Sequence, residues 1–165
     1  MDNFWSAIAG GIVAILGSVA TPVLLEWNKR KAERLSLTGA IVGEIEAIMS
    51  IAQHRKYIEG IRQVLAAAQA NPNNPGIFHF SVRRNPMRVY EANLTRIGNL
   101  PNPLPKQIVG FYAGISSILE DIDDMREGKI QRPREEQICL LTELLKLSEE
   151  TLALGQKIVD QARLN

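Results

Sequence analysis

The sequence lacks the features that mark most enzymes and nucleic-acid-binding proteins. It has no glycine-rich nucleotide-binding loop, no cluster of metal ligands and no nucleophile set at catalytic spacing. Its 19 basic and 18 acidic residues give a net charge of only +1, whereas a general nucleic-acid binder carries a strongly basic face. We therefore predict a protein that is not an enzyme and takes no cofactor, metal ion, small-molecule substrate or nucleic acid.

Cysteine is also scarce. The single residue, Cys139, excludes a disulfide bond within the chain and fits a reducing compartment. With 165 residues, 45% of them hydrophobic, the chain has enough material for one membrane span and one soluble domain with its own core.

Charge is absent from Phe4 to Leu25. As an α-helix these 22 residues would reach ~33 Å, which exceeds the ~30 Å of a bilayer's hydrocarbon core. We predict a transmembrane helix here. A cleaved signal peptide is the alternative, because Ser18-Val19-Ala20 has the small-x-small form of a cleavage site. However, no positive charge precedes the run, and the run continues beyond that site.

The charges on either side of this run predict its orientation. Asp2 is the only charged side chain before it, and a basic cluster follows it: Lys29, Arg30, Lys31 and Arg34. Because positive residues stay in the cytoplasm, we predict a single-pass protein of the cell inner membrane with its N-terminus outside. The expected divisions are an anchor at 1–27, a basic juxtamembrane segment at 28–35 and a cytoplasmic helical domain at 36–165.

Two features of the anchor region suggest contacts. Small residues recur every fourth position in the span and would let a second helix approach closely: Ser6, Gly10, Ala14 and Ser18. Such residues are also common in membrane helices that have no partner. The basic cluster after the span has two interpretations, a determinant of topology alone or a contact for anionic lipid headgroups.

The rest of the chain predicts an all-α domain. Apolar residues follow a helical period over 35–70, and the turn-forming segment 71–76 ends that pattern. We expect an extended loop at 77–84, and then three more helices at 86–99, 103–127 and 133–164. The predicted fold is therefore an antiparallel bundle of three long helices and one short one. Whether its first helix continues directly from the membrane span is left open.

The third of these helices carries its apolar residues at alternating steps of three and four, which is typical of a bundle seam: Ile108, Phe111, Ile115, Ile118, Ile122 and Met125. Gly110 and Gly114 lie beside the seam and would leave room for a neighbouring helix. The last helix has two adjacent apolar seams. It should therefore pack between two other helices or form an oligomer interface.

A few polar groups are candidate sites. Four arginines lie around the third asparagine-proline turn and would suit an anionic partner, although a surface cluster without that role is the simpler interpretation: Arg83, Arg84, Arg88 and Arg96. An acidic run at 120–127 lacks the spacing of a calcium loop, and His54 and His79 lack carboxylate ligands at metal-site spacing. Tyr90 and Asn93 are expected to form a structural hydrogen-bond network.

One pattern supports a resemblance. The run Tyr90-Glu91-x-Asn93-x-x-x-Ile97-Gly98-x-Leu100-Pro101, followed by Ile108-Val109-x-Phe111-Tyr112, resembles a pattern in small uncharacterised bacterial single-pass membrane proteins with a cytosolic helical domain. It covers roughly residues 86–115. The resemblance implies a bacterial inner-membrane setting and brings no activity with it.

These observations favour a membrane-tethered helical bundle that acts as a scaffold, adaptor or regulator of a protein partner, or that forms a homo-oligomer. The alternative is a membrane-perturbing oligomer, such as a small toxin or lysis-type protein, that assembles through the small residues of its span. An enzyme acting on a lipid or a phosphate ester is a third hypothesis and rests only on the arginine cluster and the acidic run.

Overall fold

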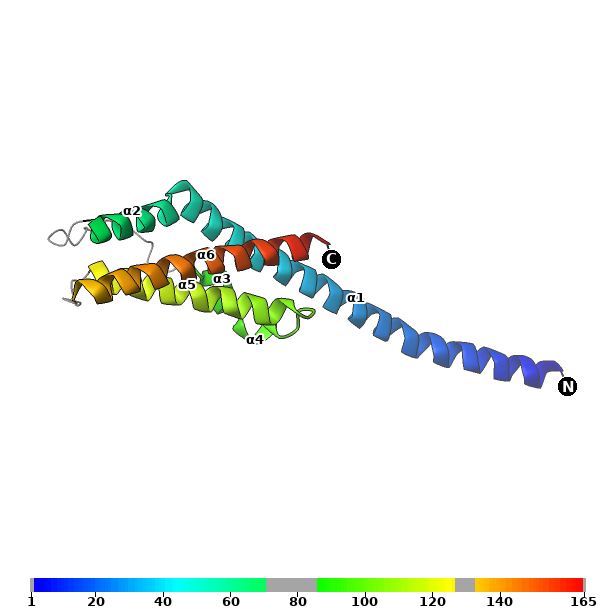
Figure 1. Cartoon of the computed structure of the whole chain (residues 1–165). Helices are drawn as coiled ribbons and strands as arrows, with labels where there is room; N and C mark the ends of the chain where they lie inside the picture. The colour runs from blue at the N-terminus through cyan, green and yellow to red at the C-terminus, as the bar shows by residue number, and fades with distance from the viewer. Residues whose placement is uncertain (1, 71–85, 127–132, 165) are drawn as a thin grey trace. The chain divides into compact units, whose positions relative to one another are not determined.

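The computed structural model describes residues 2–70, 86–126 and 133–164, with side chains from residue 22 onward. All regular secondary structure in these ranges is helical, as predicted (Figure 1). The helices in chain order are α1 (Asp2–His54), α2 (Tyr57–Ala70), α3 (Arg88–Ala92), α4 (Leu94–Ile97), α5 (Leu104–Arg126) and α6 (Arg134–Leu164). The expected extended loop at 77–84 lies outside the described residues.

The chain divides into two compact units, residues 1–37 and 38–165. The first unit is a section of α1, a helix that runs without a break from Asp2 to His54. The helix therefore continues directly from the predicted span, which is the point that the sequence left open. Among the described residues, α1 contains the one stretch, Pro22–His54, that is long and apolar enough to cross a membrane by length and composition.

In the second unit, α1 contributes one buried stripe. Ile41, Ile45 and Met49 recur every four residues and are at most 7% exposed. Residues at this spacing share one face of an α-helix, so the stripe faces the core while the rest of the helix surface stays in solvent. Among the described residues, the largest fully buried side chains lie in this unit: Tyr112, Phe111, Ile41, Ile45, Ile61, Ile108, Leu144 and Ile158.

The single helix predicted over 35–70 is wrong in one respect, because it is interrupted at Arg55 and Lys56. Lys56 has a φ of 51°, in the left-handed region that costs an L-residue about 1–2 kcal/mol. Its backbone N–H bonds to the Gln53 carbonyl, and the Gly60 N–H then bonds to the Lys56 carbonyl as α2 begins. Arg55 and Lys56 are not helix-breaking residues, so the sequence gives no local signal for the interruption. The packing of α2 against α6 offsets the cost of the left-handed backbone at Lys56.

The short helix predicted over 86–99 is also divided. Asn93 separates α3 from α4, and its side-chain amide donates to the Val89 carbonyl at 2.8 Å. Side chains that bond to the nearby backbone compete with helical hydrogen bonds, which explains the interruption. The predicted start at Pro86 is wrong because α3 begins at Arg88; the expected cap, Asn85, lies outside the described residues.

The α5 and α6 helices confirm their predicted ranges to within one residue at each described end. The α5 seam is buried at Ile108, Phe111, Ile115 and Ile122, while Ile118 and Met125 are half-buried against the cluster of Ile61, Ile122 and Leu144. The α6 helix packs against both α2 and α5. Its wide apolar face therefore packs between two other helices of the chain, which was one of the two arrangements expected.

The buried seam of α6 differs from both predicted seams, which are Ile138, Leu141, Leu145, Leu152 and Val159 and, beside it, Leu140, Leu144, Leu147, Leu154 and Ile158. It runs between them and includes three small or polar positions, Ser148, Thr151 and Gly155. A Cβ atom added at Gly155 would meet Met49 Sδ and Phe111 Cε2 at 2.7 Å, and one added at Gly114 would clash with the Thr151 side chain. The small residues therefore allow α5 and α6 to approach each other closely. Met49, from the buried stripe of α1, packs at Gly155 in the same region.

Candidate functional site

The residues expected to mediate association of the membrane span precede the described side chains. Ser6, Gly10, Ala14 and Ser18 lie in the helical section of α1 before residue 22. Their role as an association face stays a prediction.

The basic cluster after the predicted span is exposed on α1. Lys29, Arg30, Lys31 and Arg34 all have exposed side chains. Arg30 Nε lies 3.0 Å from Glu26 Oε1, and Lys31 Nζ lies 5.7 Å from the centroid of the Trp27 ring. An aromatic ring followed by cationic side chains is the composition found at membrane-water interfaces.

The predicted arginine cluster is described only in part. Arg88 is the first residue of α3 and Arg96 lies in α4, both exposed, whereas Arg83 and Arg84 lie outside the described residues. Arg96 Nη1 donates to Asn93 Oδ1 at 3.4 Å, a weak contact that leaves its charge at the surface. An anionic-partner site at this cluster stays a prediction.

The other polar candidates lie at the surface. Cys139 is exposed, with Sγ 3.8 Å from Glu143 Oε1, and His54 is exposed at the end of α1. The described part of the acidic run, 120–124, has exposed carboxylates at each acidic position. Among the residues that the structure describes, no three His, Cys, Asp or Glu side chains gather so that they could hold a metal ion.

The most connected polar group is one that the sequence analysis missed, the half-buried carboxylate of Glu44 on α1. Its Oε1 accepts a hydrogen bond from the Val89 backbone N–H at 2.7 Å, and its Oε2 accepts one from the Tyr90 N–H at 2.9 Å. These two N–H groups are in the first turn of α3, where a helix has no internal acceptors. The Tyr112 hydroxyl on α5 donates to the same Oε2 at 2.7 Å.

Glu44 thus joins three helices through one side chain, and aromatic packing reinforces the junction. The rings of Tyr90 and Tyr112 are stacked with centroids 3.9 Å apart, and Phe111 meets Tyr112 edge to face at 5.3 Å. Burial, followed by the hydrogen bond to the Glu44 carboxylate, raises the pKa of the Tyr112 phenol above its ordinary value. The hydroxyl therefore remains a donor throughout the physiological pH range. The network predicted at Tyr90 and Asn93 is therefore replaced by one centred on Glu44, which Tyr90 joins through its backbone N–H, while the Asn93 side chain bonds to the Val89 carbonyl.

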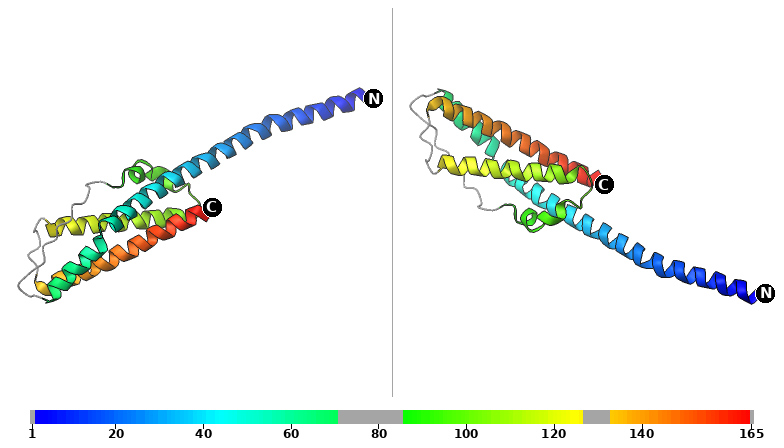
Figure 2. Two further views of the ribbon diagram at one scale, coloured as in Figure 1. Left: turned by 90° about the horizontal axis from the view of Figure 1, so that it is seen from above. Right: turned by 90° about the horizontal axis from the view of Figure 1, so that it is seen from below.

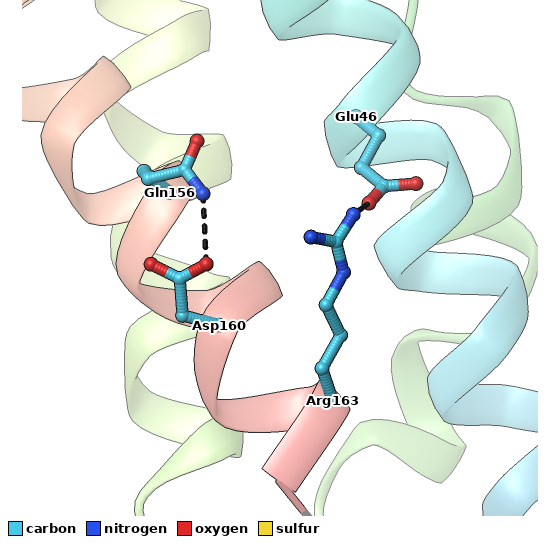
Figure 3. A network of polar contacts seen from close by, with 4 residues as sticks. All are labelled: Glu46, Gln156, Asp160 and Arg163. Carbon is cyan, nitrogen blue, oxygen red and sulfur yellow. Dashed lines mark hydrogen bonds and ion pairs between the residues drawn. The ribbon is translucent and has the colours of Figure 1, made fainter.

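Three further contacts tie helices together at the surface. Arg163 near the end of α6 reaches Glu46 on α1 at 2.7 Å, while Gln156 and Asp160 bond along α6 itself (Figure 3). Arg62 on α2 pairs with Glu149 on α6.

At the other end of α6, Arg134 donates to the carbonyls of Ala68 and Gln69, at 3.1 and 2.7 Å. These carbonyls are in the last turn of α2, where a cation is favoured by the helix dipole.

Two of the shallow depressions in the surface of the second unit lie entirely among described residues. The first, of about 230 Å³, is polar and surrounds the Arg163–Glu46 pair. The second, of about 360 Å³, lies between α4 and α5 and is mainly apolar, with one basic residue at its edge: Leu94, Ile97, Gly98, Pro105, Lys106 and Val109. Leu94 and Val109 expose about half of their surface, 55% and 49%.

A sequence signal for Glu44 does exist. Glu44 lies next to Ile45 and three residues after Ile41, so a charge stands beside the apolar stripe of the helix. A charged group there must find partners or be strongly destabilising. Only the fold shows that these partners come from residues 89, 90 and 112.

Comparison of the chain with protein-family models, with curated proteins and with solved structures gives no match. The structure does account for much of the pattern noted at 86–115. Ile97, Leu100, Ile108, Phe111 and Tyr112 are buried, and the Tyr90 ring stacks on Tyr112. Burial in the core therefore explains these positions of the pattern, whereas Val109 is 49% exposed.

Proposed function

We propose that the chain is a membrane-tethered helical-bundle protein that binds a protein partner at the cytosolic face of a bacterial inner membrane, without catalysing a reaction. In this proposal the section of α1 around residues 4–25 spans the bilayer. The second unit is the cytoplasmic bundle, and it serves as scaffold, adaptor or regulator.

The observation that carries the proposal is the surface of α1 just before the basic cluster. Val23, Leu24, Leu25 and Trp27 are consecutive or nearly so, and each is 59–64% exposed. Covering such a turn with hydrocarbon stabilises it by about 25 cal/mol for each Å² of apolar surface removed from water. The exposed cations of residues 29–34 then favour the cytoplasmic side for everything that follows.

The second unit supports the binding role. Glu44, Tyr112 and Arg134 use their polar atoms to join helices to one another, so these groups stabilise the fold. A compact unit with exposed charged faces, held beside a membrane, is suited to presenting a surface to a partner. The apolar depression between α4 and α5 is one such surface.

Affinity purification of the full chain from native membranes in mild detergent, after chemical cross-linking, tests the proposal. We expect a second protein to co-purify in a constant ratio. A Gly155→Leu variant, which forces α6 away from Met49 and Phe111, should stay in the membrane and lose that partner. Recovery of the chain alone contradicts the partner-binding role.

A second readout separates the proposal from the membrane-perturbing alternative. Overproduction of the full chain should leave the membrane potential unchanged if the protein is a tethered binding unit. Loss of the potential on overproduction would favour an oligomer that assembles through Ser6, Gly10, Ala14 and Ser18.

A further inference from the structure

The junction between α1 and α2 has a conformation that its own residues do not favour. Arginine and lysine are good helix formers, yet Arg55 and Lys56 interrupt the helix, and Lys56 has a left-handed φ of 51°. The Arg55 N–H still bonds to the carbonyl four residues before it, and the Gly60 N–H bonds to the Lys56 carbonyl in the same pattern. A change of the backbone angles around Lys56 would therefore join α1 and α2 into one helix.

The course of α2 makes this change a small one. Beyond the junction, α2 continues away from the end of α1 and does not fold back along it (Figure 1). Figure 2 shows the same course from two further sides. A continuous helix would restore the hydrogen bonds between the last turn of α1 and the first turn of α2, which the interruption removes. Relief of the left-handed residue alone favours the straight form about 5–30-fold at each junction.

Contacts with α6 keep α2 in its bent position. Ile61 of α2 is 2% exposed and belongs to a buried cluster that includes Leu144 of α6. At the surface, Arg62 pairs with Glu149, and Arg134 bonds to the carbonyls in the last turn of α2. None of these contacts requires that the two helices belong to one chain. The surface of α6 that a straightened α2 would leave therefore fits the α2 helix of a second copy, residue for residue.

The length of the chain after α2 allows such an exchange. Glu44 on α1 holds the first turn of α3 in the same chain, through the N–H groups of Val89 and Tyr90. In a continuous helix, twenty-six residue steps would place Ala70 ~39 Å from Glu44 along the axis. The eighteen residue steps from Ala70 to Arg88 reach up to ~60 Å. The α3 helix can therefore stay bound to its own α1 while α2 leaves.

We propose that two copies of the chain exchange α2. In each copy α1 and α2 form one continuous helix, and α2 packs on the α6 helix of the other copy. All the α2–α6 contacts are kept, now between chains, and both left-handed residues are relieved. Association costs translational freedom, so the exchange increases with the concentration of the chain. The inference concerns the second unit alone and does not rest on the proposed membrane anchor or protein partner.

Cross-linking between two co-produced, differently tagged copies of the full chain tests the exchange in mild detergent. Both copies carry Cys139→Ser. One copy also carries Arg62→Cys on α2 and the other Glu149→Cys on α6, at positions whose side chains pair in the structure. A short bismaleimide then links the two tags when α2 of one copy lies on α6 of the other. The control chain carries both cysteines, so the bent form gives a link within that chain.

We expect a cross-linked dimer that carries both tags. Lys56→Gly should lower its yield about thirtyfold for each junction, because glycine accepts the left-handed φ and is less favourable than lysine inside a helix. Gln63→Gly is the matched control, at an exposed position of α2 that is helical in both forms, and should leave the yield unchanged. The link within the control chain, repeated with each glycine substitution, shows that α2 still packs on α6.

Three results overturn the inference. A link within the control chain without any doubly tagged dimer shows that α2 stays on its own α6. A doubly tagged dimer that Lys56→Gly does not reduce assigns the link to copies that associate side by side with bent junctions. Absence of both links contradicts the α2–α6 contact on which the exchange depends.

Discussion

The two sections of α1 carry similar aliphatic side chains in opposite surroundings. Val23, Leu24 and Leu25 expose 59–64% of their surface, whereas Ile41 and Ile45 expose none. Backbone conformation is the same in both sections, since the helix is continuous from Asp2 to His54. The difference therefore lies in what covers each face, and the proposed membrane anchor would supply the covering of the first section.

Truncating an apolar side chain in each section should give the largest contrast. Ile45→Ala should lower the free energy of unfolding of the second unit by about 2–5 kcal/mol, because it removes a fully buried side chain and leaves a cavity. Leu25→Ala should change it by less than about 0.5 kcal/mol. Thermal and denaturant unfolding in detergent, followed by circular dichroism, measures both. Equal effects would contradict the difference in burial between the two sections.

Glycine substitutions sharpen the comparison at the level of packing. Gly155→Ala should destabilise by about 1–3 kcal/mol, because the new methyl group meets Met49 and Phe111. Gly43→Ala on α1 has nothing within 4 Å of the new atom, so it should stabilise by up to about 1 kcal/mol through helix propensity. A destabilised Gly43→Ala variant would show that α1 packs more tightly than described.

The Glu44 junction should give an intermediate effect. Glu44→Gln keeps the shape of the side chain but replaces a carboxylate that accepts three hydrogen bonds, and should cost about 1–3 kcal/mol of unfolding free energy. Glu46→Gln is the matched control on the same helix, since its partner Arg163 is exposed, and should cost less than about 1 kcal/mol. Equal losses would argue against a special role for Glu44.

Alkaline pH tests the same junction through Tyr112. The folded state holds the pKa of this phenol above its ordinary value of about 10, so at higher pH the unfolded chain loses a proton that the folded chain keeps. Stability from this group is therefore complete below pH ~10 and declines above it, by at most about 1.4 kcal/mol per pH unit. Tyr112→Phe should flatten that decline in unfolding curves measured from neutral to alkaline pH. An unchanged slope would contradict the raised pKa.

The smallest effect is expected at the contact between α6 and the end of α2. Arg134→Ala removes two hydrogen bonds to the carbonyls of Ala68 and Gln69 and should cost about 1 kcal/mol. Arg62→Ala, which breaks an exposed ion pair between the same two helices, should cost less. Hydrogen exchange of the last turn of α2 should accelerate only in the Arg134 variant; acceleration in both would contradict a specific cap.

Much of the fold follows from periodicity. The α5 seam and the ranges of α5 and α6 were predicted because alternating steps of three and four and flanking prolines are local signals. The interruption at Lys56 and the placement of Ser148, Thr151 and Gly155 in the α6 seam were not predicted. Each depends on how closely another helix approaches, which a single segment does not encode.

The polar interior was harder to predict than the apolar one. Tyr90 and Asn93 were expected in a network, but its acceptor comes from Glu44, more than forty positions earlier in the chain. Arg134 shows the same difficulty, since its acceptors lie on α2. A side chain's hydrogen-bonding capacity is visible in the sequence, whereas its distant partner is set by the fold.

Thiol labelling along α1 tests the central claim most directly. In a Cys139→Ser background, Val23→Cys and Ser50→Cys are treated with a water-soluble maleimide in native membrane vesicles opened to expose both faces. Both positions are exposed in the structure, so only an outside covering can distinguish them. We predict rapid labelling at residue 50 and protection at residue 23 by lipid; labelling of both at the same rate would contradict a membrane-embedded α1.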